Sequence, residues 1–168
     1  MTIDDWRGKE GIMIAPPEEE KIFYYFDDFK QGQAFDLGST SISQEDIIEF
    51  AQKYDPQPFH VDKEVAGFIF GGIIASGWHT AALCQRLLVD SFLSKTAGLG
   101  SPGVDELRFL KPVRPGDTLS GKLTITEIRP SKSKTDRGWI KAKGEMIRQD
   151  GEVVLSLVGT IIVARRTN

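Results

Sequence analysis

The sequence is poor in the residue types that build most metal and disulfide sites. Its 168 residues include one cysteine, Cys84, and two histidines, His60 and His79. A single cysteine excludes an internal disulfide framework and an all-cysteine zinc site. Two histidines leave little room for a histidine-built metal centre, so very few titratable groups must carry the function.

An excess of positive charge is also missing. Lysine and arginine total 21 and aspartate and glutamate total 24, which gives a formal net charge of -3. We therefore expect no nucleic-acid partner, because no broad basic field is present to hold a phosphate backbone. The glycine fingerprints of phosphate-binding loops and dinucleotide-binding folds are absent as well.

The sequence also lacks a signal-peptide pattern. It begins MTIDDWRGKEG, with acidic residues at once and no apolar run. The stretch from Val65 to Gln85 holds no charged residue over 21 positions, which is long enough to cross a bilayer. Glycines and polar residues interrupt this stretch, however, and favour a buried helix of a globular fold. We expect a soluble cytoplasmic protein with no membrane partner.

The pattern of apolar residues predicts one α+β domain. Hydrophobic residues make up 40% and charged residues 27% of the chain, and its length suits a single domain. We expect an irregular N-terminal arm over residues 1–22 and one domain over residues 23–168. Apolar residues recur at helical spacing in the middle of the chain and alternate with polar residues in its C-terminal half.

The predicted order of elements is strand, helix, loop, long helix and four strands. Ser43 can cap the first helix, with Asp46 three residues on, and Pro56 and Pro58 end it. The long helix begins near Gly77, and we expect it to be buried because apolar residues surround most of it. An antiparallel sheet wrapped on this helix is the predicted architecture. The predicted spans are about 43–54 and 77–94 for the helices, and 34–41, 104–110, 119–126, 139–149 and 153–163 for the strands.

Asp55 and His60 are the first candidate for chemistry. Both lie on one short loop that prolines stiffen. A carboxylate and an imidazole that converge on one water can act as an acid and base pair, since the histidine pKa lies near neutrality. The alternative is an aspartate that caps loop amides and a histidine that binds a backbone group.

The segment that leads into the long helix, GIIASGWH at 72–79, is the second candidate. The first turn of a helix has free N–H groups and a partial positive charge. A carbonyl placed at Gly77 would be polarised there, and a developing enolate stabilised. The alternative is a glycine that only helix packing requires. We interpret His79 as structural or as part of an interface, and Cys84 as a small buried hydrophobic residue.

Three segments together resemble the MaoC-like dehydratase family, which includes the (R)-specific enoyl-CoA hydratases. They are DPQPFHVD at 55–62, GGIIASGW at 71–78 and FLKPVRPGD at 109–117, and they occur in the family's order. The resemblance runs from about Phe26 to Arg166. It implies the hot-dog fold, an antiparallel sheet wrapped around a long central helix, and it implies a homodimer.

The resemblance also implies the reaction and the residues that perform it. The family's catalytic pair falls on Asp55 and His60, and the glycine whose amide holds the thioester carbonyl falls on Gly77. The implied reaction adds water reversibly to a trans-2-enoyl-CoA thioester and gives a (3R)-hydroxyacyl-CoA. Asp55 would accept the proton of the attacking water, and His60 would orient that water and protonate C2. No metal or other cofactor is implied, because coenzyme A is part of the substrate.

Two residues of the site depart from the family pattern. Gln57 stands where the family often has asparagine, and Ser76 stands where it often has histidine. We expect both to orient the site. Phe68 and Phe70 are candidates for the acyl pocket, although such residues can equally be plain core.

Two other functions remain open. A non-catalytic acyl-thioester binding or regulatory protein could use the same fold, and so could an acyl-CoA thioesterase. The acyl chain length, its branching and the choice between coenzyme A and acyl carrier protein do not follow from the sequence.

Overall fold

The computed structural model describes residues 22–166. Apart from Ile22, the expected N-terminal arm lies outside the described residues. The helices are α1 (Gln44–Tyr54), α2 (Pro58–Val61), α3 (Lys63–Phe70) and α4 (Gly77–Ser91), with short 3-10 turns η2 (Phe26–Asp28) and η3 (Leu93–Lys95). The strands are β1 (Ala34–Ser41), β2 (Gly98–Phe109), β3 (Thr118–Pro130), β4 (Arg137–Arg148) and β5 (Val153–Ala164).

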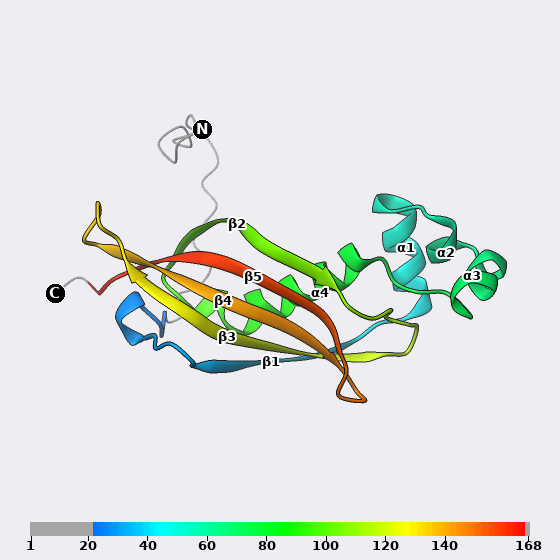
Figure 1. Ribbon diagram of the computed structural model, residues 1–168, viewed down its shortest axis with the longest axis horizontal. Coiled ribbons are helices and arrows are strands. Elements are labelled where there is room, and N and C mark those ends of the chain that lie inside the picture. The colour runs from blue at the N-terminus through cyan, green and yellow to red at the C-terminus, as the bar shows by residue number, and fades with distance from the viewer. Residues whose placement is uncertain (1–21, 167–168) are drawn as a thin grey trace.

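The five strands form one antiparallel sheet in the order β1-β3-β4-β5-β2. The sheet curves along α4, whereas α1, α2 and α3 gather beyond one end of it (Figure 1). Alternate residues of β3, among them Leu119, Leu123 and Ile125, are buried on the face toward the helix. The predicted α+β class and the hot-dog arrangement of a sheet around one helix are therefore confirmed.

The first helix begins as its sequence predicts. Ser43 accepts a hydrogen bond from the Asp46 backbone N–H at 3.0 Å, and the Asp46 carboxylate accepts one from the Ser43 backbone N–H at 3.1 Å. This reciprocal capping box satisfies donors that a helix start otherwise leaves free. It fixes where α1 starts, and α1 in turn carries Asp55 at its C-terminal end.

The central helix differs from its prediction in two ways. Cys84, Leu87 and Leu88 are buried on one side of α4, but Trp78 on the other side is 61% exposed. The expectation that the helix would be buried on most sides was therefore wrong for the side that carries Trp78. The helix also ends at Ser91 rather than near residue 94. Phe92 leaves the helical conformation because its fully buried ring packs into an aromatic cluster with Tyr24, Phe29 and Phe35.

The uncharged stretch before α4 contains the end of a helix that the sequence interpretation missed. Asp62 caps α3, since its carboxylate accepts hydrogen bonds from the Glu64 and Val65 backbones. Gly71 ends α3 in the left-handed conformation, at φ 73°. Between residues 22 and 166, no helix is long and apolar enough to cross a membrane.

Candidate active site

Asp55 is held at the point where α1 ends. Its backbone N–H donates to the Ala51 carbonyl at 2.8 Å, and its own carbonyl accepts from the Gln57 N–H at 2.7 Å. Pro56 cannot continue the helix, and Pro58 starts α2 at a position where a missing N–H costs nothing. The loop therefore presents the Asp55 side chain in one fixed direction.

The Asp55 carboxylate accepts two side-chain hydrogen bonds. Ser76 donates its hydroxyl to Oδ2 at 2.6 Å, and Gln57 donates its amide to Oδ1 at 2.8 Å. The bond from Ser76 is the main cause that lowers the pKa of Asp55 below its ordinary value; burial opposes this shift and Gln57 adds to it. Asp55 is consequently an ionised acceptor at neutral pH. The structure thus brings both predicted orienting residues, Gln57 and Ser76, onto the carboxylate.

His60 lies buried beside this carboxylate. Its Nδ1 is 2.7 Å from the carbonyl oxygen of Ile74, and because a carbonyl only accepts, Nδ1 must carry the proton. The other ring nitrogen, Nε2, faces Asp55 Oδ2 at 3.5 Å, and in the neutral ring it is an acceptor. A water molecule beside the two groups could donate one proton to each of these acceptors.

Ser76 and Gly77 form the start of α4. The Ser76 hydroxyl oxygen accepts from the Trp78 N–H at 3.2 Å while the same group donates to Asp55. Within the described chain, no residue accepts a hydrogen bond from the Gly77 N–H. A Cβ at Gly77 would stand 2.5 Å from the Phe109 ring, so close packing also requires glycine here. Gly77 thus meets both alternatives considered for it: close packing requires a glycine, and its backbone N–H has no acceptor among the described residues.

His60 and Gly77 line one cavity of about 240 Å³. Phe70 lines it too, whereas Phe68 is 94% exposed and does not, and the assignment of both to the acyl pocket stays a prediction. The sequence interpretation missed Thr80 and Lys111 in this cavity. Thr80 follows Gly77 by three residues, so helical spacing could have placed it on the same face.

The remaining histidine and the cysteine lie elsewhere on α4. The ring of His79 stacks on Phe50 of α1, with centroids 4.4 Å apart and planes 6° from parallel, and burial lowers the pKa of His79. Burial raises the pKa of Cys84 to about 11, which keeps its thiol protonated and unreactive at neutral pH. Among residues 22–166, no group of three or more acidic, histidine or cysteine side chains is placed to hold a metal ion.

The sequence also matches a known protein family. Residues 28–143 match the model of the MaoC-like domain, and the chain belongs to the MaoC-like dehydratase family. A protein named (R)-specific enoyl-CoA hydratase, from Rhodospirillum rubrum, is 34% identical over 122 residues, which cover 68% of this chain and 78% of that protein. The uncharacterized protein YdeM of Bacillus subtilis is 34% identical over 108 residues, which cover 64% of this chain and 77% of that protein.

Solved structures agree with the fold. The crystal structure of a MaoC-like dehydratase from Rhodospirillum rubrum matches with a TM-score of 0.81 and 40% identity, over 86% of this chain and 99% of that one. A double hot-dog protein from Mycobacterium tuberculosis matches with a TM-score of 0.72 over 86% of this chain and 45% of that one, and at 18% identity it supports the fold alone.

Replacement of Ser76 by alanine separates its role as a cap from its role as a donor to Asp55. We expect Ser76→Ala to lose about 1 kcal/mol of unfolding free energy, as cap removals do. We also expect the pKa of Asp55, followed by NMR titration of its carboxyl carbon, to rise, because its principal hydrogen-bond donor is gone. Since that bond depresses the pKa in the folded state, the stability it contributes is present above the unfolded pKa and is lost as the pH falls.

The matched control is Ser43→Ala, which removes the equivalent cap from α1 and leaves the Asp55 carboxylate untouched. It should cost similar stability and leave the pKa of Asp55 unchanged. An Asp55 pKa that does not move in Ser76→Ala, or that moves equally in both variants, would show that the hydroxyl does not control this carboxylate.

Proposed function

We propose that this protein adds water reversibly to a trans-2-enoyl-CoA thioester and forms the (3R)-hydroxyacyl-CoA. The observation that carries this proposal is that Asp55 Oδ2 lies 3.5 Å from Nε2 of His60, and that His60 lines one cavity together with Gly77. The 34% identity to the Rhodospirillum rubrum protein named (R)-specific enoyl-CoA hydratase supports the same reaction class.

The two acceptors suit a single attacking water. A water that donates one O–H to Asp55 and the other to His60 Nε2 presents its lone pairs away from both groups, toward C3 of a bound enoyl chain. Holding the nucleophile in this way removes much of the entropic barrier to attack. The hydrogen bond from His60 Nδ1 to Ile74 fixes the ring orientation that this water needs.

The proton balance closes within the pair. As the water oxygen bonds to C3, Asp55 accepts one water proton and the electron pair of the double bond moves toward C2 and the thioester carbonyl. His60 returns one proton to C2. In the neutral Nδ1–H tautomer Nε2 is unprotonated, so the proton that His60 delivers to C2 is the water proton that Asp55 accepted and passes to Nε2, and the enzyme is unchanged at the end of the cycle.

Gly77 stabilises the charge that forms meanwhile. Negative charge develops on the thioester oxygen in the enolate-like transition state. The Gly77 N–H stands at the first residue of the 15-residue helix α4, where the helix dipole favours an anion. Amide donors aimed at a developing oxyanion are commonly worth a factor of about 10² to 10³ in rate.

Loss of the enoyl absorbance with a panel of trans-2-enoyl-CoA thioesters tests this proposal. The wild type should consume the enoyl group without release of free thiol. His60→Ala and Asp55→Asn should each lower kcat by about 10²- to 10⁴-fold, as loss of a general acid or base does. Asp36→Asn, a matched change at an exposed position of strand β1, should leave the rate unchanged.

The other outcomes point to other functions. Equal hydration by His60→Ala and wild type would refute the proposed mechanism. Release of free thiol would indicate a thioesterase, and tight acyl-CoA binding without turnover would indicate a binding protein.

We further propose that two copies pair through β2. This strand is an edge of the sheet, and its backbone hydrogen-bonding groups on the outer side face no other strand of the described sheet. Leu99, Val104 and Phe109 are exposed along it. A long edge strand with apolar residues favours pairing with a further strand, and antiparallel pairing of β2 with its own copy closes as a two-fold dimer.

The size of the particle in solution tests this pairing. Light scattering should give the mass of a dimer for the wild type. Val104→Lys should yield a monomer, because it places a charge at the centre of the proposed contact. Thr40→Lys on the opposite edge, β1, is the control and should remain a dimer. A monomeric wild type, or a dimer that only Thr40→Lys breaks, would contradict pairing through β2.

A further inference from the structure

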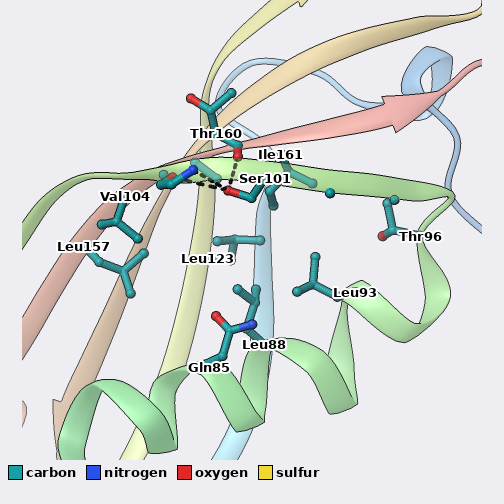
Figure 2. A pocket seen from close by; sticks show the side chains of 15 residues that line it. Gln85, Leu88, Leu93, Thr96, Ser101, Val104, Leu123, Leu157, Thr160 and Ile161 are labelled. Carbon is teal, nitrogen blue, oxygen red and sulfur yellow. Dashed lines mark hydrogen bonds between the residues drawn. The ribbon is translucent and has the colours of Figure 1, made fainter. Parts of the chain in front are cut away.

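A second cavity lies under the first half of β2. It occupies about 320 Å³ between this strand, β5 and the C-terminal half of α4 (Figure 2). Its walls are mainly aliphatic, and no charged side chain lines it. The aliphatic lining residues include Leu88, Leu93, Leu123, Ala142, Leu157 and Ile161.

Glycine and one serine build this cavity. Gly100 and Gly103 have φ values of 122° and 142°, which side-chain-bearing residues rarely adopt, and the register of β2 on β5 shifts at both. Ser101 donates to the Thr160 carbonyl at 2.6 Å and holds the bulged strand in place. Gly159 opposite adds no side chain, so the space between strand and helix stays open.

Gln85 is an exposed residue that lines this space with a polar side chain. Its carboxamide rises from α4 toward the sheet (Figure 2), and no described residue hydrogen-bonds to it. The other polar side chains are engaged or turned away. The Thr96 hydroxyl donates to the Phe92 carbonyl at 2.7 Å, and the Thr160 side chain points to the opposite face of the sheet.

The proposed dimer brings this cavity to the active site. Within one chain, Gln85 lies eight residues beyond Gly77 on α4, a rise of about 12 Å. Phe109, which packs against Gly77, lies at one end of β2, and the cavity lies under the other end. Antiparallel pairing of β2 with its copy places the Phe109 end of one chain beside the cavity end of the other.

We infer that this cavity receives the acyl tail of a substrate that carries a neutral hydrogen-bonding group, a hydroxyl or a carbonyl, and that Gln85 binds that group. The inference rests on the proposed hydration of enoyl thioesters. A carboxamide can donate to a carbonyl and both donate to and accept from a hydroxyl. A tail ending in a carboxylate is disfavoured, because no cationic side chain in the lining would compensate its desolvation.

Matched pairs of thioesters test the inference. Plain trans-2-enoyl-CoA thioesters of increasing length are compared with their ω-hydroxy and ω-oxo counterparts, for the wild type and for Gln85→Leu. At the length that reaches Gln85, the wild type should prefer a polar tail by about 3- to 10-fold in kcat/KM, the effect of one net hydrogen bond. Gln85→Leu should lose or reverse this preference, mainly through KM.

Two controls separate the possible failures. Crotonyl-CoA is too short to reach Gln85, so its hydration by Gln85→Leu should equal that of the wild type and report an intact fold. Gln52→Leu, the same change on the exposed side of α1, should keep the preference for polar tails. If the wild type hydrates plain and polar tails alike at every length, or if Gln85→Leu affects both alike, the role of Gln85 is refuted while the proposed hydration stands. If the wild type hydrates none of the thioesters, the proposed function itself fails.

Discussion

The short hydrogen bond from the Ser76 hydroxyl to Asp55 is the interaction on which the site depends. At 2.6 Å it joins the residue at the end of α1 to the residue at the start of α4. The same hydroxyl caps α4 through Trp78. The Ser76 side chain therefore lowers the pKa of the Asp55 carboxyl, caps the first turn of the central helix and holds the two close together. Gly77, whose N–H has no acceptor among the described residues, directly follows Ser76 in the first turn of this helix.

A second constraint aligns the imidazole. His60 is buried, and its Nδ1 donates to the Ile74 carbonyl in the segment between α3 and α4. That segment is itself bound to the sheet's connection, because Ala75 donates to the Val113 carbonyl at 2.8 Å. The three sequence segments that resemble the family thus meet at one place. Each supplies either a reacting group or the backbone that orients one, which explains why they matter together although they lie far apart in the chain.

Local features of the fold could be predicted and non-local ones could not. The start of α1 follows from Ser43 and Asp46, which interact within one turn, and the alternation in β3 follows from one buried face. The short helix α3 was missed because its signals, Asp62 and Gly71, enclose only eight residues. Phe68 was predicted to line a pocket because it is apolar, yet its side chain is 94% exposed in this chain. Apolarity alone does not say which surfaces pack against a side chain. The bond between Ser76 and Asp55 spans 21 positions and no local pattern predicts it.

The stereochemistry of hydration in deuterated water tests most directly whether one water is shared by Asp55 and His60. Asp55 Oδ2 and His60 Nε2 lie 3.5 Å apart, so a water held by both should deliver oxygen to C3 and deuterium to C2 from one face of the double bond. NMR coupling between the hydrogens at C2 and C3 of the product should report a single deuterium added syn to a (3R)-hydroxyl. Anti addition, or deuterium scrambled at C2, would contradict the shared water.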